Sequence, residues 1–401
     1  MNSGILTGVR VIDLTQALAG PYCTQLLADF GADIIKIERP GSGDQSRGWG
    51  PPFLEGESAY FLGTNRNKRS LALDLSKDGA RPVLERLLKS ADVLVHNVPK
   101  HKSRVKLGID AETVMAINPA LVWASISGFG LTGPEAEKPG YDVLAQGMSG
   151  TMALTGEPDA GPTRFPTPMA DITSALYATI AVLGALYERR ESGAGQIIDI
   201  ALLDGQATWL ANVASAYLAT GNPPRKRGNA HPNIAPYQPF RAKDGRLILA
   251  VGTETQWVRF LEVLPDGGVL AQDQAFRTNA DRVAHRERLE VEINKRLAGG
   301  SVDEWLNRFG GAGIPCGPIL TPEAALEHPQ LLAREMVVRM AHPKAGEIRT
   351  LGNPIKLSRT PIVPPVAPPT LGQHTREILE EVGFSSTEVG KVLEAGVAAE
   401  G

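Results

Sequence analysis

Asp171 is the residue whose type and position in this chain point most clearly to chemistry. It lies in the segment MADIT (169–173), after Pro166 and Pro168 and before a long apolar run. We therefore predict that it occupies the first turn of a buried helix, Ala170–Arg190. A helix N-terminus has partial positive charge and unpaired N–H groups, which hold a carboxylate in its ionised form. An ionised aspartate can attack an acyl group and form a covalent intermediate. The alternative is that Asp171 only completes the helix, because Asp is a favoured N-cap residue.

Bulk composition limits the kind of protein that carries this aspartate. The chain has 401 residues, of which 42% are hydrophobic and 21% charged, and this predicts a folded protein of two domains. The formal net charge of −3 gives no electrostatic case for a nucleic-acid or anionic-membrane partner. Two cysteines and no C-x-x-C argue against a disulfide scaffold or a cysteine zinc site and favour a reducing, cytoplasmic location. We also expect no apolar run of membrane-spanning length.

The first half of the chain alternates β-branched runs with helical segments. The runs that we predict as strands are 9–14, 33–38, 70–75, 92–97, 121–127 and 196–202. Such alternation is typical of a parallel sheet covered by helices, so we predict an α/β fold.

The residue composition changes near Thr220, where the Pro-, Gly- and Asn-rich segment GNPPRKRGNAHPNIAP indicates a linker or a long functional loop. The elements predicted after it are a hairpin at 240–251, helices at 255–264, 282–297 and 301–309, and a final helix from about Thr375. We therefore predict a large domain from residues 1–222 and 323–401, with a smaller α+β domain at 223–322 between its two parts.

The familiar cofactor and metal motifs do not fit. GFGLTG at 128–133 is a literal G-x-G-x-x-G after a predicted strand, but Pro134 and Pro139 follow where a helix should begin. We interpret it as a glycine-rich loop. The histidines show no metal-ligand spacing, and there is no G-x-S-x-G serine-hydrolase motif. We expect no metal and no permanently bound cofactor.

Three basic or polar loops lie near predicted strand ends. They are ERPGSGD at 38–44, NRNKR at 65–69 and the stretch from His96 to Lys106. Open α/β sheets bind ligands beyond the carboxyl ends of their strands, and Arg or Lys there suits a phosphorylated ligand. Each loop alone is more simply a solvated basic loop, but together they favour an anionic, nucleotide-like ligand.

The chain resembles the class III CoA-transferases, the family of formyl-CoA transferase and carnitine CoA-transferase. The motifs that carry the resemblance run in order along nearly the whole chain: GVRVIDLTQALAGPYCTQLLADFGADIIKIERPGSGD, NRNKRSLALDL, GFGLTGP, GYD at 140–142, MADITSALYA, IPCGPI and LGQHT. The resemblance implies an interlocked homodimer of ring-like subunits. Each subunit would have a Rossmann-like large domain, formed by both termini, and a small domain between them.

The resemblance also implies covalent carboxylate catalysis. The family's aspartate falls on Asp171, which would attack an acyl-CoA thioester, pass through a mixed anhydride and form an aspartyl-CoA thioester. One thioester is exchanged for another, so coenzyme A enters as part of the substrate, and neither ATP nor a metal is needed. Gly228, in the GNAHP loop with His231, would allow close backbone approach and cover the intermediate.

The family's coenzyme A contacts carry over residue by residue. The residues that the resemblance implies are Leu18, Ala19, Arg39, Leu73, Asn97, Tyr141, Lys138 and either Arg104 or Lys106. The last choice stays open because the run from Asn97 to Gly108 is one residue longer than the family's usual spacing.

Two departures bear on the acceptor acid. Leu18 stands where formyl-CoA:oxalate enzymes have glutamine, and the GNAHP loop replaces their run of glycines. The LAGP pattern is closer to members that use dicarboxylates, such as succinate–hydroxymethylglutarate CoA-transferase, and Arg47 or Arg66 would then pair with a distal carboxylate. The alternatives are a formyl-CoA:oxalate CoA-transferase and an α-methylacyl-CoA racemase. Racemases use a histidine in a G-H-D segment for acid–base chemistry, whereas this chain has GYD at 140–142.

Overall fold

A computed structural model describes residues 4–401, and the chain divides into two compact units. Unit 1 consists of Met1–Met152, Arg164–Ser215 and Pro329–Gly401, and unit 2 consists of Ala153–Thr163 and Ala216–His328. The first and last described residues therefore both belong to unit 1, and each unit is described by itself.

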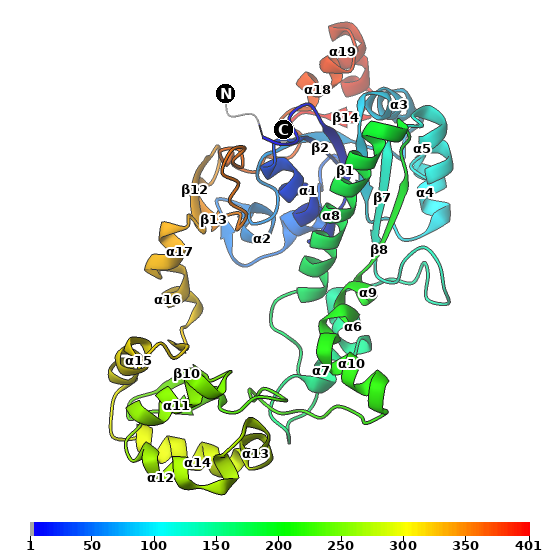
Figure 1. Ribbon diagram of the computed structural model, residues 1–401. Coiled ribbons are helices and arrows are strands. Elements are labelled where there is room, and N and C mark those ends of the chain that lie inside the picture. The colour runs from blue at the N-terminus through cyan, green and yellow to red at the C-terminus, as the bar shows by residue number, and fades with distance from the viewer. Residues whose placement is uncertain (1–3) are drawn as a thin grey trace. The chain divides into compact units, whose positions relative to one another are not determined.

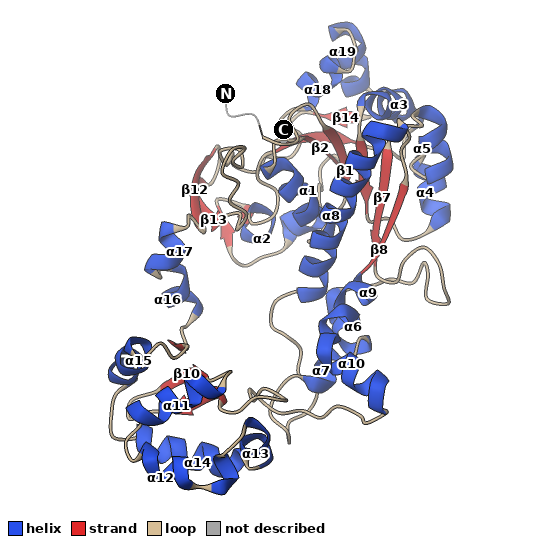
Figure 2. Cartoon of the chain, viewed as in Figure 1, coloured by secondary structure: helices blue, strands red, loops and turns tan. Residues whose placement is uncertain are grey.

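A seven-stranded sheet forms the centre of unit 1 (Figures 1 and 2). Its strands are β1 (Arg10–Leu14), β2 (Asp33–Glu38), β5 (Lys68–Leu73), β6 (Val93–His96), β7 (Val122–Ser127), β8 (Ile197–Ala201) and β14 (Ala398–Ala399). They lie in the order β14-β5-β2-β1-β6-β7-β8, and β14 alone is antiparallel to its neighbour. The six parallel strands thus have the Rossmann-type order 3-2-1-4-5-6. The predicted α/β class is confirmed, and each of the six predicted strands matches a strand to within two residues.

Helices cover both faces of this sheet, because its strands are apolar on both sides. Helices α1 (Ala19–Asp29) and α8 (Met169–Ser192) contribute to one core, which includes Val11 of β1. The next residue, Ile12, points into the opposite core. The helices that contribute to that second core are α3 (Arg81–Ser90), α5 (Ala111–Ile117), α18 (Thr375–Glu381) and α19 (Ser386–Glu394). The result is a three-layer arrangement that fixes where each strand ends.

Shorter elements complete unit 1. They are the helices α2 (Ala59–Leu62), α4 (His101–Leu107), α6 (Asp142–Met148), α9 (Leu202–Ala207) and α17 (Pro329–Ala333), and the strands β3 (Phe53–Leu54), β4 (Glu57–Ser58), β12 (Val337–His342) and β13 (Gly346–Leu351). Helices α7 (Thr151–Leu154) and α10 (Ala211–Thr220) each span a sequence limit between the units. The hairpin of β12 and β13 was not predicted from the sequence.

Helix α8 corrects one expectation. It has 24 residues, and an 18-residue window within it has a mean hydropathy of 1.6, so by length and composition alone it could cross a membrane, contrary to the expectation that no apolar run reaches that length. Its buried residues, such as Ala175 and Val182, belong instead to a core of unit 1. A central helix of a folded protein passes the same test, because burial against a sheet also requires an apolar face.

Unit 2 has a small antiparallel sheet in the order β11-β10-β9. Its elements are β9 (Tyr237–Arg241), β10 (Arg246–Ala250), α11 (Glu254–Val263), α12 (Gly267–Gln272), α13 (Asn279–Ala284), α14 (Arg286–Leu297), α15 (Val302–Gly311), β11 (Cys316–Pro318) and α16 (Pro322–Leu326). Phe260 and Phe309 stack in its core with ring centroids 5.4 Å apart. The helix predicted at 282–297 is two helices, because the backbone leaves helical geometry at His285 (φ −111°, ψ 30°).

A buried network of charges supports the loop after β1. Lys36 is fully buried, with its Nζ 2.9 Å from Asp44 Oδ2 and 4.0 Å from Asp13 Oδ2, and it donates to the Thr15 carbonyl at 2.8 Å. Asp44 in turn accepts from the backbone N–H of Ala17 at 3.1 Å. Burial opposes the charge on Lys36, but Asp13 and Asp44 outweigh it and raise the pKa of the amine above its usual value. The network therefore holds the backbone of residues 15–17 through its hydrogen bonds to Thr15 and Ala17.

Candidate active site

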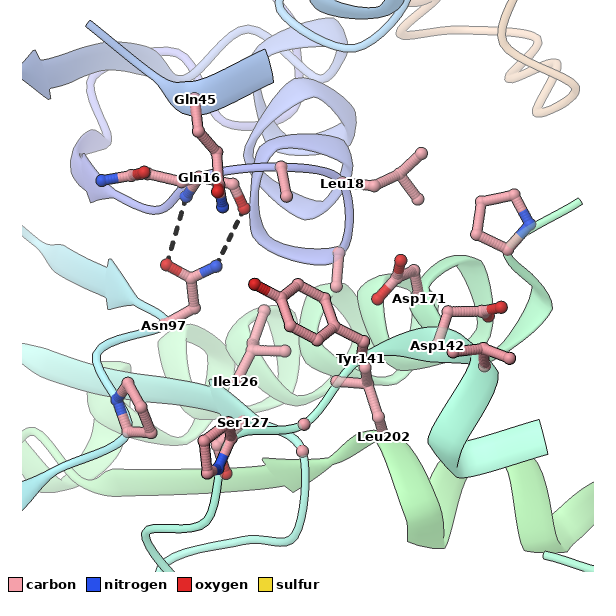
Figure 3. A pocket seen from close by; sticks show the side chains of 18 of the residues that line it. Gln16, Leu18, Gln45, Asn97, Ile126, Ser127, Tyr141, Asp142, Asp171 and Leu202 are labelled. Atoms are coloured by element: carbon pink, nitrogen blue, oxygen red, sulfur yellow. Dashed lines mark hydrogen bonds between the residues drawn. The ribbon is translucent and has the colours of Figure 1, made fainter. Parts of the chain in front are cut away.

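A cavity of about 780 Å³ opens at the carboxyl ends of β1, β6 and β7. It lies where the chain order reverses between β1 and β6, the usual ligand position in an open α/β sheet. Asn97 joins the two loops there: its Nδ2 donates to the Gln16 carbonyl at 2.8 Å, and its Oδ1 accepts from the Gln16 N–H at 3.1 Å (Figure 3). The loops after β1 and β6 are therefore joined at the cavity by two hydrogen bonds between the Asn97 side chain and the Gln16 backbone.

The N-terminus of α1 forms one wall of this cavity. Leu18 is the N-cap residue and Ala19 the first helical residue, and both line the cavity. No side chain caps this helix, so the first N–H groups of α1 have no intrahelical acceptor. Such groups stabilise negative charge that develops on a bound ligand.

Asp171 lies on the cavity wall in the first turn of α8 (Figure 3). Among the described residues 4–401, no hydrogen bond or ion pair reaches its carboxylate. The N–H group of the preceding residue, Ala170, donates instead to Asp142 Oδ1 at 2.8 Å, and Gln146 Nε2 donates to Asp142 Oδ2 at 2.7 Å. Asp142 therefore takes the capping role that the sequence offered as the alternative for Asp171, and the Asp171 carboxylate stays free to react.

The structure also corrects the expected electrostatics of Asp171. Burial, together with the negative charge of Asp142, raises the pKa of the Asp171 carboxyl to about 7. The expectation that the helix N-terminus holds this group ionised is thus wrong, because another carboxylate accepts from the N–H group at that terminus. A carboxylate with a raised pKa is a stronger base and nucleophile than an ordinary aspartate, and perturbed groups of this kind concentrate at functional sites.

This electrostatic coupling predicts a pH dependence. If Asp171 is the nucleophile that the family resemblance implies, its protonation removes the reactive form, so we expect kcat/KM for the acyl-CoA substrate to fall as the pH drops below about 7. Asp142→Asn removes a negative charge but keeps an acceptor for the Ala170 N–H, so it should lower the pKa of Asp171 and move the acidic limb to lower pH. Rate profiles between pH 5 and 9 measure this shift. Asp204→Asn, at an exposed site on α9, is the matched control; an unmoved limb in Asp142→Asn would contradict the coupling.

The position of Tyr141 in the cavity depends on a close backbone contact between Gly128 and Gly140. A Cβ atom added to Gly140 would lie 2.3 Å from the Cα of Gly128, at the end of β7, so no side chain fits between these backbones. The contact sets where the following residues, Tyr141 and Asp142, begin α6.

We therefore expect Gly140→Ala to displace Tyr141. The substitution should lower the free energy of unfolding by about 1–3 kcal/mol, as overpacking does, and raise KM for acyl-CoA. Thermal unfolding and steady-state kinetics check both effects. Gly310→Ala is the control, since an added Cβ there has no neighbour within 4 Å, and equal behaviour of the two variants would refute the packing argument.

The cavity brings together five of the residues that the sequence singled out. They are Leu18, Ala19, Asn97, Tyr141 and Asp171. They come from the loops after β1 and β6 and from the N-termini of α6 and α8, so the family motifs that are far apart in sequence meet at one edge of the sheet.

The other residues expected to contact coenzyme A lie outside the cavity lining. Arg39 is exposed after β2, and Leu73 is buried at the end of β5. Lys138 is exposed and paired with Glu135. Arg104 is buried and donates to the carbonyls of Val98 and Pro99, two lining residues, whereas Lys106 is exposed beside a second cavity of about 310 Å³.

Arg47 and Arg66, expected to bind a distal carboxylate, are occupied within the protein. Arg47 donates to both oxygens of Glu38, at 2.7 and 2.8 Å. Arg66 is buried and pairs with both oxygens of Asp29. Neither lines the cavity, because each guanidinium already neutralises a buried carboxylate that would otherwise be unpaired. Neither is therefore available to an acceptor acid.

Gly228 and His231 belong to unit 2. Gly228 has φ +58°, and a Cβ added to it would lie 2.7 Å from Glu157 Oε2. The ring of His231 packs against Tyr237 with centroids 5.1 Å apart. Neither residue lines the cavity of unit 1.

Several lining residues escaped the sequence analysis. They are Gln16, Gln45, Tyr60, Asp142 and Arg164. Burial and the charges of Asp171 and Asp142 raise the pKa of the Tyr60 phenol to about 12, so the phenol keeps its proton at neutral pH. Asp142 was visible within the GYD motif, and Arg164 could have been found as a lone cation in the proline-rich segment before Asp171.

Three comparisons relate this geometry to known proteins. A family model described as CoA-transferase family III matches residues 6–375. The succinate–glutarate CoA-transferase of Agrobacterium fabrum is 42% identical over 383 residues, which are 94% of this chain and 95% of that protein. The acetyl-CoA:oxalate CoA-transferase of Acetobacter aceti is 38% identical over 356 residues, 88% of this chain and 90% of that protein. The crystal structure of a CAIB/BAIF family protein from Brucella suis matches with a TM-score of 0.85 and 41% identity, and covers 95% of this chain and 100% of that chain.

Proposed function

Since this chain belongs to CoA-transferase family III, we propose that it transfers coenzyme A from an acyl-CoA to a dicarboxylic acid through a covalent aspartyl-CoA thioester at Asp171. The observation that supports this most directly is the state of Asp171. It is a carboxylate of raised pKa, without a hydrogen-bond partner among residues 4–401, on the wall of a cavity beside an uncapped helix N-terminus.

The reaction proceeds in four exchanges. The Asp171 carboxylate attacks the thioester carbonyl, and coenzyme A leaves as a thiolate while a mixed anhydride forms. The thiolate then attacks the aspartyl carbonyl, which gives the aspartyl-CoA thioester and releases the donor acid with one oxygen from Asp171. The acceptor carboxylate attacks this thioester, forms a second mixed anhydride and releases the coenzyme A thiolate. The thiolate then attacks the acceptor's carbonyl in that anhydride. A new acyl-CoA and a free Asp171 remain. Thioester is exchanged for thioester, so the chemistry calls for neither ATP nor a metal.

The N-terminus of α1 supplies the stabilisation that these steps need. Every attack on a carbonyl places negative charge on oxygen, and preorganised backbone N–H groups lower the barrier to its formation. The N–H groups at Leu18 and Ala19 fit this role because no side chain caps the helix. The network beneath the loop keeps them in place, through the bond from the Ala17 N–H to Asp44.

Coenzyme A would extend from this cavity toward exposed cations at the strand ends. We assign its thioester end to Leu18, Ala19, Asn97 and Tyr141, and its nucleotide end to the region of Arg39, Leu73, Lys106 and Lys138. Of the two cations left open by the sequence, Lys106 is the better candidate for a phosphate contact, since Arg104 holds two backbone carbonyls.

The racemase alternative lacks its base. A racemase moves an α-proton between an aspartate and a histidine. Tyr141 occupies the position of that histidine, and no histidine is among the described residues that line the cavity. Transfer through Asp171 needs no second base.

A second copy of the chain is the expected partner. Helix α8 leaves large side chains exposed, with Ile180 at 64% and Tyr187 at 71%. A protein interface would cover these side chains, so their exposure suits the interlocked homodimer implied by the family resemblance. Size-exclusion chromatography with light scattering tests this. We also assign the enzyme to the cytoplasm, where its free Cys23 and Cys316 would stay reduced.

Mass spectrometry of the intermediate tests the proposed function. Incubation with succinyl-CoA in the absence of an acceptor, followed by rapid acid quench, should give a coenzyme A adduct that maps to the Asp171 peptide. Transfer without any adduct across quench times shorter than one turnover would contradict the covalent route. Exchange of the substrate α-proton for deuterium without an acceptor would contradict the assignment as a transferase and favour the racemase.

A further inference from the structure

One cation lines the cavity of unit 1 among the residues that the structure describes, and it is Arg164. No other lysine, arginine or histidine in the described chain contributes to the lining. Its guanidinium forms no ion pair or hydrogen bond within residues 4–401. Arg164 is exposed, so an acid that enters the cavity beside the two acidic side chains can reach its guanidinium.

We propose that Arg164 binds the carboxylate of the dicarboxylic acid that does not react. This proposal rests on the proposed CoA transfer and names the residue that selects the acceptor class. A guanidinium offers two parallel N–H donors that match the two oxygens of a carboxylate, so it recognises this group better than an amide or a hydroxyl does.

The backbone around Arg164 is fixed to the helix that carries Asp142. The N–H group of Phe165 donates to Gln146 Oε1 at 2.8 Å, and the N–H group of Ala170 donates to Asp142 Oδ1 at 2.8 Å. Pro166 and Pro168 further limit the backbone between these two anchors. The segment therefore starts at the arginine and ends at the nucleophile, with both ends attached to α6.

Charge balance in the cavity supports the same assignment. Asp142 and Asp171 both face the cavity, and the charge of one already raises the pKa of the other (Figure 3). A dicarboxylate adds a second negative charge that takes no part in the reaction. Without a cation this charge would be repelled, so an acceptor with two carboxylates needs a positive group that the site otherwise lacks.

The internal pairing of Arg47 and Arg66 strengthens this conclusion. Both were expected to bind the distal carboxylate, and both are instead bonded to Glu38 and Asp29. Lys138 is exposed and outside the lining. Among the described cations, Arg164 is thus the one that lines the cavity and could bind the distal carboxylate.

The test compares glutarate with its monoamide, which has the same length but a neutral distal end. With a fixed acyl-CoA donor, Arg164→Gln should lower kcat/KM for glutarate by about 10- to 100-fold, chiefly through KM, while the value for the monoamide stays within about twofold. Arg164→Lys keeps the charge but not the paired donors, so it should retain an intermediate preference for glutarate. Arg349→Gln, at an exposed site on β13, is the matched control and should behave as the unaltered enzyme.

Three outcomes would overturn the proposal. One is an unchanged kcat/KM for glutarate in Arg164→Gln. Another is an equal loss for glutarate and the monoamide, which would place Arg164 on a coenzyme A phosphate. The third combines two results: Arg164→Gln loses the circular dichroism spectrum of the folded enzyme, and Arg164→Lys has normal kinetics. A bidentate contact requires that both variants bind glutarate less well. The aspartyl-CoA adduct is measured in parallel: if it forms in both variants, the proposed function stands even when this assignment fails.

Discussion

Replacement of Asp171 by Asn is expected to lower kcat for CoA transfer by at least about 10³-fold, the order of loss that follows removal of a covalent nucleophile. The amide is nearly the same size as the carboxylate but is a poor nucleophile, so neither the mixed anhydride nor the aspartyl-CoA thioester can form. Folding should persist, because no hydrogen bond within residues 4–401 depends on this carboxylate. Affinity for coenzyme A, measured by calorimetry, should change little.

Two further variants make this result specific. Asp171→Ala guards against slow conversion of the amide back to the acid and should be equally inactive. Asp204→Asn removes an exposed carboxylate from α9 and should keep full activity. Substantial transfer by Asp171→Ala would refute the nucleophilic role, whereas loss of both activity and coenzyme A binding would show that the residue mainly supports the structure of the cavity.

Replacement of Lys36 by Met is expected to have the largest effect on stability. The amine lies between Asp13 and Asp44, both buried, and its removal leaves these carboxylates with one counter-charge fewer. Breaking a buried ion pair from one side costs about 3–5 kcal/mol, because an uncompensated charge remains in the core. Lys68 donates to Asp13 at 3.0 Å but forms no hydrogen bond or ion pair with Asp44, so it cannot fully replace Lys36.

Urea unfolding followed by fluorescence measures this cost. Lys89→Met, an exposed lysine in the last turn of α3, is the matched control and should lower the free energy of unfolding by less than about 0.5 kcal/mol. The surviving folded fraction should also have a raised KM for acyl-CoA, because the Thr15 carbonyl loses its donor and Asp44, which accepts from the Ala17 N–H, loses its counter-charge. Equal stabilities of the two variants would show that the network does not support this part of the fold.

Local sequence patterns were enough to predict the central sheet. The six parallel strands are β-branched runs separated by helical segments, and each fell within two residues of its predicted limits. The hairpin of β12 and β13 was missed because VVRMAH and GEIRTL mix apolar and charged residues without a recognised turn between them. Its stability comes from Met340 and Ile348, which pack against Leu62, a contact that no local pattern records.

The sequence predicted where Asp171 lies, but it did not predict the charges around it. The position of Asp171 at a helix start followed from sequence, but the pKa of the group depends on Asp142, which is far away in sequence and competes for the N–H of Ala170. Likewise, the sequence shows Arg47, Arg66 and Arg164 as equally charged. The structure distinguishes the three arginines. Arg47 pairs with Glu38 and Arg66 pairs with Asp29, whereas Arg164 lines the cavity without such a pair.

Oxygen transfer to Asp171 tests the central claim most directly. In the proposed reaction, the acceptor carboxylate leaves one of its oxygens on the Asp171 side chain each time that a new acyl-CoA is released. After turnover with ¹⁸O-labelled glutarate, proteolysis and mass spectrometry should find the label in the Asp171 peptide and not in the peptide of Asp204. Complete turnover with an unlabelled Asp171 peptide would mean that the acceptor attacks the acyl-CoA directly, and would contradict covalent catalysis by Asp171.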